Sequence, residues 1–216
     1  MILNRVAGIL LPITALPSPH GIGCFSEEAY RFVDWLKKAG QGIWQILPLG
    51  PTGYGDSPYQ SFSSYAGNPY MISLGSLCDR GLLTEEECEA SAAELWSDRI
   101  RYGALYRTRY PLLRRAFERA RVRRDPERER MEERLSPWLE EYALFMAIKE
   151  HLGGIPLCRW HEELRLRNPS ALDRCRRELA EEIAYQKFMQ TEFFLQWFRL
   201  KEYANGRGIR VMGDLP

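Results

Sequence analysis

Several features that would point to common functions are scarce or missing in this sequence. Basic and acidic residues nearly cancel, at 30 and 29, so the charge excess that drives nucleic-acid binding is lacking. No apolar run approaches the roughly 18 residues that cross a bilayer. The five cysteines include no C-x-x-C pair, and the three histidines have no metal-ligand spacing. We therefore expect no nucleic-acid or membrane partner, no metal, and thiols in a reducing cytoplasm.

Motifs for nucleotide and serine-hydrolase chemistry are also missing. Gly53-Tyr54-Gly55 continues as Asp56-Ser57-Pro58, without the third glycine of a dinucleotide fingerprint. Neither a phosphate-binding P-loop nor a G-x-S-x-G nucleophile elbow occurs. The sequence thus gives no reason to expect a bound cofactor.

Charge divides the chain into two parts. Residues 1–78 hold four basic and four acidic residues, and between Ala39 and Cys78 the only charge is Asp56. The remaining chain carries 26 basic and 25 acidic residues. The first part is typical of a buried, loop-rich core with a site, and the second of amphipathic helices that face water. The mixed-sign stretch 121–134 predicts a solvated helix surface.

Three short apolar stretches, 6–13, 43–49 and 208–213, have the length and composition of buried strands. Between the first two, Ser26 is a candidate N-cap and Gly40 a stop signal, with apolar residues at helical spacing between them. Strand, helix and strand in this order predict a parallel sheet with a right-handed crossover.

The rest of the chain predicts helices. Thr84 and Glu87 form a capping box, Ser136-Pro137 begins a helix that Gly153-Gly154 stops, and a stretch from Asn168 to Gly206 is long enough for two helices or a bent one. Five aromatic residues in the last stretch are expected in the core: Phe188, Phe193, Phe194, Trp197 and Phe198.

The loop after the second strand, residues 50–70, is rich in aromatic and small polar residues. Flat aromatic faces beside hydroxyl groups suit sugars, and loops at the carboxyl ends of parallel strands bind ligands. Asp214, just past the third strand, would point into the same site. Two structural interpretations stay open: a packed loop with core tyrosines, and a turn or cap role for Asp214. The aromatic residues of the loop are Tyr54, Tyr59, Phe62, Tyr65 and Tyr70.

The stretch ILPLGPTGYGDSPYQSFSSYAGNPY (46–70) closely resembles the 4-α-glucanotransferases, the amylomaltases of glycoside hydrolase family 77. The opening GILLPITALPSPHGIG, the stretch EYALFMAIKEHLGGIPLCRW and the final GIRVMGDLP resemble the same family in order and spacing. The resemblance implies an α/β fold, an incomplete (β/α)8 TIM barrel that holds strands one to three. Residues 1–76 would carry the first strands and the sugar-binding loop, 77–205 a helical insertion and the helix into strand three, and 206–216 the third strand.

The resemblance further implies transfer of an α-1,4-glucan segment to the 4-position of an acceptor sugar, without cofactor. In such a retaining mechanism a carboxylate forms a glycosyl-enzyme and a second carboxyl group acts as acid and base. The family's three catalytic carboxylates lie on later strands, so no residue of this chain takes those roles. Tyr59, Ser57 and Asp214 match substrate contacts, and Tyr54 and Tyr102 resemble aromatics of a secondary glucan site.

Other functions are compatible with the sequence. An α-glucan hydrolase of related barrel type would differ in its products, and a non-catalytic glucan-binding module would bind maltooligosaccharide as the isolated chain. A helical interaction protein built on residues 80–205 would not need the 50–70 loop. Because the chain ends directly after a strand, we expect it to be the first portion of a longer protein.

Overall fold

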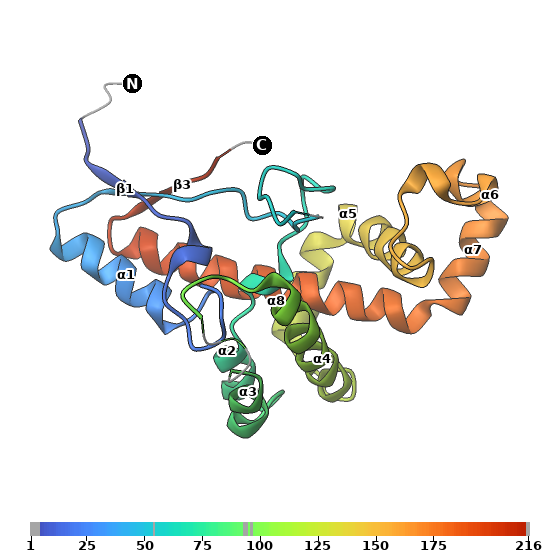
Figure 1. Cartoon of the computed structure of the whole chain (residues 1–216), viewed down its shortest axis with the longest axis horizontal. Coiled ribbons are helices and arrows are strands. Elements are labelled where there is room, and N and C mark those ends of the chain that lie inside the picture. The colour runs from blue at the N-terminus through green and yellow to red at the C-terminus, as the bar shows by residue number, and fades with distance from the viewer. Residues whose placement is uncertain (1–4, 54, 93–94, 96, 215–216) are drawn as a thin grey trace. The chain divides into compact units, whose positions relative to one another are not determined.

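The computed structural model describes residues 5–53, 55–92, 95 and 97–214 (Figure 1). The chain divides into two compact units. The first comprises residues 1–124 and 192–216, and the second comprises residues 125–191. No helix in the described ranges is both long and apolar enough to cross a membrane.

The first unit contains a parallel sheet built from the three predicted strands. Within the described residues its order is β1 (Gly8–Leu10), β2 (Ile43–Gln45), β3 (Arg210–Met212). The central register aligns Ile9, Trp44 and Val211. A side chain at Gly8 would meet Ile43, since its Cβ would lie 2.7 Å from the Ile43 Cβ, so only glycine allows this approach. The predicted parallel βαβ unit is confirmed.

Helix α1 (Glu27–Lys38) connects β1 to β2 and begins after Ser26, as predicted. It ends before Gly40, whose φ of +68° is the left-handed conformation that glycine adopts readily. The Phe32 ring of α1 packs edge on against the Trp44 ring of β2, with 5.0 Å between the ring centroids. On α8 (Ala180–Gly206), Tyr203 donates hydrogen bonds to Asp34 of α1. Figure 1 shows α1 and the C-terminal half of α8 side by side beneath the strands.

Between β2 and α8, the first unit continues through η2 (Pro69–Met71), α2 (Leu74–Asp79), α3 (Glu85–Ala92) and α4 (Tyr102–Ala120). The predicted capping box is confirmed: the Glu87 amide donates to the Thr84 hydroxyl at 3.3 Å, and the Thr84 amide donates to the Glu87 carboxylate at 3.0 Å. Arg119 of α4 adds two bonds to the same carboxylate, at 2.7 and 2.8 Å. This carboxylate therefore fixes the start of α3 against α4.

We expect acid to weaken this link. The Arg119 hydrogen bonds, with the Thr84 amide, lower the pKa of Glu87 from 4.5 to about 2. Because the pKa is lower in the folded state, the stabilisation is present above pH 4.5 and disappears as the pH falls toward 2. Urea unfolding of the wild type and Glu87→Gln should show a stability difference at pH 7 that closes below pH 4.5. A difference independent of pH would contradict the assignment.

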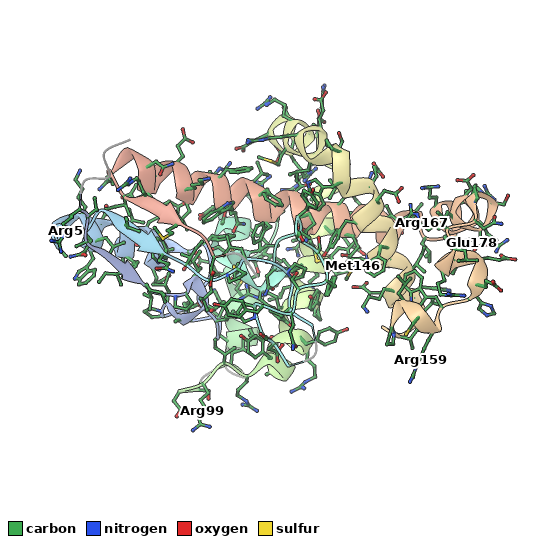
Figure 2. All side chains as sticks on the ribbon, turned by 90° about the horizontal axis from the view of Figure 1, so that it is seen from above. Arg5, Arg99, Met146, Arg159, Arg167 and Glu178 are labelled. Atoms are coloured by element: carbon green, nitrogen blue, oxygen red, sulfur yellow. The ribbon has the colours of Figure 1, made fainter. Side chains whose placement is uncertain are left out.

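The second unit is helical, with α5 (Pro126–His151), η3 (Leu157–Arg159), α6 (Glu162–Arg165), α7 (Pro169–Glu178) and the start of α8. Gly153 and Gly154, at φ +71° and +77°, follow the end of α5 as predicted. Asn168 caps α7, and the long last stretch divides into α7 and α8, so the first of the two predicted alternatives, two helices instead of one bent helix, is the one observed. Figure 2 shows the exposed Arg159 side chain projecting outward from this unit.

The predicted helix start at Ser136-Pro137 is wrong. The helix begins eleven residues earlier, with Asp125 and Pro126 in place of Ser136 and Pro137, and the Asp125 carboxylate accepts from the amides of Glu127 and Arg128. Pro137 lies inside α5, although a proline there removes one helical hydrogen bond. Leu135 and Leu139 are buried on either side of Pro137, so their packing stabilises the helix across the proline. An Asp-Pro start and apolar packing together outweigh the interior proline.

The aromatic residues expected in the core differ in burial. Phe188 and Phe193 are buried, whereas Phe194, Trp197 and Phe198 are half-buried. In the first unit the Phe193 ring packs edge on against Phe25 at 5.1 Å and lies directly over Gly67. Phe193 therefore joins α8 to the end of the loop that follows β2.

Replacing Gly67 by alanine should destabilise the chain by about 2 kcal/mol, because overpacking forces neighbouring groups to move. The added Cβ would lie 2.2 Å from ring carbons of Phe193. Gly75→Ala is the matched control, since its Cβ meets only the Ser73 hydroxyl at 3.7 Å. Urea unfolding measures both variants, and equal stabilities would show that the Phe193 contact is not tight.

Candidate functional site

The loop between β2 and η2 is closed at its base and turned sharply at its tip. The Asn68 amide donates to the Leu49 carbonyl at 2.8 Å, which brings the two ends of the loop together. At the tip, Gly55 and Asp56 both have positive φ, +92° and +56°. The turn places the Asp56 amide 3.2 Å from the Gly53 carbonyl. The residues after this turn are thereby directed to the carboxyl end of the sheet.

Tyr59 and Asp214 meet at that edge. The Tyr59 hydroxyl donates to the Asp214 carboxylate at 2.7 Å, although 155 positions separate the two residues. Tyr59 belongs to the loop after β2, and Asp214 follows β3. Because β2 and β3 are parallel neighbours, both chains leave the sheet at the same end. The expected convergence of these two residues is confirmed, while their contact with sugar stays a prediction.

The Tyr59–Asp214 pair presents both an aromatic face and a charged acceptor. Half of the Tyr59 surface is exposed, so its ring is available to a ligand. The hydrogen bond to Asp214 raises the pKa of Tyr59, which keeps its hydroxyl protonated well above neutral pH. The Asp214 carboxylate is thus oriented by a neutral donor and retains further lone pairs for hydroxyl groups of a ligand.

Ser57 contributes to the shape of this site. Its hydroxyl accepts from the Tyr59 amide at 3.3 Å, and its carbonyl accepts from the Gln60 amide at 3.2 Å. Ser57 therefore forms the turn that presents Tyr59. A direct bond from Ser57 to sugar stays a prediction.

The two residues predicted for a secondary glucan site are placed differently. Tyr54 lies outside the described residues. Tyr102, the first residue of α4, is half-buried with its ring 6.0 Å from that of Tyr70. It lines a small cavity of about 30 Å³ together with Asp56 and Pro58. A space of this size holds water and no sugar ring, so a role for Tyr102 depends on its exposed edge.

The sequence did not predict the backbone conformation of Asp56 or its electrostatic effect on neighbouring tyrosines. Asp56 is a non-glycine residue in the left-handed region, which aspartate tolerates better than most side chains. Burial raises its pKa, and its charge in turn raises the pKa of Tyr102 and Tyr70, after burial of those rings. The glycine before it and its isolation as the loop's only charge were the available signals.

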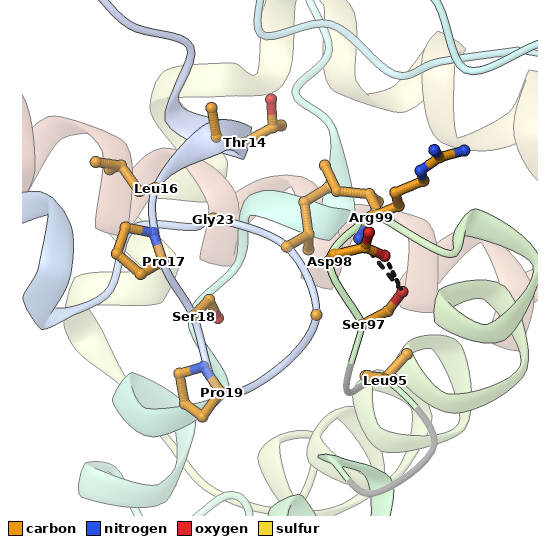
Figure 3. Close-up of a pocket in the computed structure, with 14 residues that line it drawn as sticks. Thr14, Leu16, Pro17, Ser18, Pro19, Gly23, Leu95, Ser97, Asp98 and Arg99 are labelled. Carbon is orange, nitrogen blue, oxygen red and sulfur yellow. Dashed lines mark hydrogen bonds between the residues drawn. The ribbon is translucent and has the colours of Figure 1, made fainter.

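A second polar concavity lies next to the loop that follows β1. Figure 3 shows this pocket of about 410 Å³, walled by residues 14–19 and 97–100. The Ser97 hydroxyl lies 3.4 Å from the Asp98 carboxylate on one wall. None of the described residues predicted to contact sugar lines it. No group of three or more His, Cys, Asp or Glu side chains suited to a metal occurs in the described ranges.

The sequence profile of the family described as 4-alpha-glucanotransferase matches residues 11–216. The 4-alpha-glucanotransferase of Thermus thermophilus is 46% identical over 220 residues, covering 100% of this chain and 43% of the relative. That of Clostridium butyricum is 42% identical, covering 94% of this chain and 42% of the relative. The structure titled amylomaltase from Streptococcus agalactiae in complex with acarbose has a TM-score of 0.91 at 39% identity, covering 99% of this chain and 43% of that one.

The chain thus spans about two-fifths of the length of the relatives it matches. Its three parallel strands and their helices share the α/β fold of amylomaltase. The match includes the loop after β2 and the end of β3, which together hold Tyr59 and Asp214. The chain belongs to the 4-alpha-glucanotransferase family, glycoside hydrolase family 77.

Proposed function

We propose that this chain is the N-terminal portion of an enzyme that moves a segment of α-1,4-glucan to the 4-position of an acceptor sugar. The observation that carries the proposal is the Tyr59–Asp214 hydrogen bond at the shared carboxyl end of β2 and β3. An aromatic face beside a carboxylate suits a glucose unit, whose ring faces are apolar and whose edge carries hydroxyl groups. The names of the relatives, and the acarbose in the similar amylomaltase, support this substrate class.

In the proposed fold, β1, β2 and β3 are strands one to three of a (β/α)8 barrel. Residues 1–76 would form the first strands and the sugar-binding loop, 77–205 the helical insertion with the helix into strand three, and 206–216 that strand. The parallel order and the α1 crossover support this arrangement. A barrel also pairs the outer edges of β1 and β3, which a three-stranded sheet leaves open.

The proposed contribution of this chain to the reaction is to hold the glucan. Tyr59 would stack on a sugar ring, Ser57 would add a polar contact, and Asp214 would accept hydrogen bonds from sugar hydroxyls. Fixing the glucan in this way supports a retaining mechanism in which two carboxyl groups lie about 5 Å apart. Those two groups would come from the part of the enzyme beyond residue 216. No cofactor is needed for this chemistry.

The family relatives are named transferases, which favours transfer over the hydrolase and the non-catalytic binding module. We also place the enzyme in the cytoplasm. Support comes from its five cysteines, which all lie in the described ranges and are all thiols, as expected in a reducing compartment.

Incubation with maltotriose tests the activity. The 216-residue chain alone should form no oligosaccharides longer than maltotriose. A chain extended to the length of its relatives should form both longer products and glucose. Hydrolysis products alone from the extended chain, with excess glucose acceptor present, would contradict transfer. Longer products from the 216-residue chain would contradict the placement of the catalytic carboxyl groups beyond it.

A further inference from the structure

Two cysteine sulfurs meet in the first unit. The Sγ atoms of Cys78, in α2, and Cys88, in α3, lie 3.4 Å apart. Cys88 is buried, at 4% exposure, whereas Cys78 is half-buried. The sulfurs are already in contact, so a bond of normal length requires them to approach by only about 1.4 Å.

The turn between the two cysteines is held by groups other than the sulfurs. The Leu82 amide donates to the Leu77 carbonyl at 2.8 Å, which folds the chain back after α2. Arg119 donates to the Leu82 carbonyl at 3.1 Å and to the Glu87 carboxylate. Because these bonds fix both α2 and the start of α3, the sulfurs are brought together before any covalent bond forms.

We propose that Cys78 and Cys88 form a dithiol site that reacts with a low-molecular-weight disulfide, such as oxidised glutathione, and becomes an intramolecular disulfide. The Cys78 thiolate attacks one sulfur of the reagent, breaks its S–S bond and releases the first small thiolate. The Cys88 sulfur then attacks Cys78, gives its proton to the solvent, and displaces the second small thiolate. The protein loses two hydrogen atoms, and the reagent is reduced to two thiols.

The order of the two steps follows from exposure. Cys78 is the more exposed of the two residues, so a reagent in solution is expected to reach it first. Burial, followed by the contact with the Cys78 sulfur, raises the pKa of Cys88, so very little of its reactive thiolate exists at neutral pH. Cys88 therefore reacts slowly with external reagents and closes the ring only onto the sulfur beside it. The resting form of the pair in a reducing compartment remains the dithiol.

Peptide mapping tests the proposal on the 216-residue chain. Trypsin cleaves after Lys38, Arg80 and Arg99, which puts Cys78 and Cys88 on separate peptides, 39–80 and 81–99. After incubation with oxidised glutathione, alkylation and digestion, we expect these two peptides joined by a disulfide. The reaction should be about tenfold faster in the folded chain than in concentrated urea, because the fold holds the sulfurs together.

Serine variants separate the two steps. Cys88→Ser should stop at one glutathione on residue 78, and Cys78→Ser should give no joined peptides. Cys158→Ser removes an exposed thiol of the second unit and should give the same joined peptides as the wild type. Equal thermal unfolding of the reduced variants would show that each is folded.

Two results would overturn the proposal. One is a wild-type product that retains glutathione on Cys78 while Cys88 stays open to alkylation after unfolding. The other is ring closure at the same rate in urea as in the folded chain, which would mean that the short sequence separation alone joins the sulfurs. Both readouts are independent of glucan transfer and of the proposed function.

Discussion

Tyr59→Ala, made in a chain extended to the length of the relatives, is expected to lower kcat/KM for maltooligosaccharide transfer by about tenfold or more, because the substrate loses its positioning. The alanine removes both the exposed ring and the hydroxyl that bonds to Asp214 at 2.7 Å. Steady-state kinetics with maltotriose measures the effect. An unchanged kcat/KM would show that Tyr59 does not position the substrate.

Tyr59→Phe is the matched variant, since it keeps the ring and deletes only the hydrogen bond to Asp214. We expect a loss of kcat/KM between the wild type and the alanine variant. Because Tyr59 is half exposed, both variants should keep the free energy of unfolding within about 0.5 kcal/mol of the wild type. A large loss of stability in either variant would assign Tyr59 the role of a packed loop residue.

The largest stability effect is expected at Arg109. This side chain of α4 is 1% exposed, and its guanidinium donates to the Ile72 carbonyl at 2.9 Å and to the His20 carbonyl at 3.4 Å. Arg109→Ala leaves a cavity and deprives the buried Ile72 carbonyl and the half-buried His20 carbonyl of a charged donor. Together these effects should cost about 4 kcal/mol, measured by urea unfolding.

Arg107→Ala provides the control on the same helix. Arg107 is exposed, so its removal should change the free energy of unfolding by less than about 0.5 kcal/mol. Arg109→Lys keeps a charge but lacks the forked guanidinium, and we expect an intermediate loss. Similar stabilities for the alanine variants at 107 and 109 would show that burial of the Arg109 side chain and its two carbonyl contacts contribute little.

The Arg109 contacts connect stability to the site. His20 belongs to the loop after β1, and Ile72 follows the loop that carries Tyr59. One side chain therefore holds both loops at the carboxyl end of the sheet. If the proposed sugar site is correct, a variant at Arg109 that still folds should have a higher KM for maltooligosaccharide in the extended chain, although Arg109 is not itself among the predicted sugar contacts.

Patterns that depend on nearby residues predicted the fold well. Helix α1 begins after Ser26 and ends before Gly40 as predicted, because helix-end signals are local, although the Ser26 hydroxyl makes no capping hydrogen bond. The capping box of Thr84 and Glu87 is local in the same way. The convergence of Tyr59 and Asp214 was predictable too, since it follows from the parallel order of two strands. The prediction failed at Ser136-Pro137, where burial of the flanking leucines decided the outcome.

Features that depend on the packing of distant segments could not be predicted from the sequence. Arg109 stands among several arginines of α4, and nothing in its spacing shows that it alone is buried. The contact of the Cys78 and Cys88 sulfurs depends on how the chain folds back between α2 and α3, which cysteine spacing does not reveal. The left-handed backbone of Asp56 likewise follows from the closed loop around it.

The long separation between Tyr59 and Asp214 has a consequence for synthesis on the ribosome. A nascent chain makes the tyrosine early, but its acidic partner emerges only after 154 further residues. Until β3 pairs with β2, the phenol has no anion to orient, so the proposed sugar site at this edge is complete only after the third strand has docked. Any saccharide that bridges the two residues will therefore favour the docked strand over a detached one, by mass action.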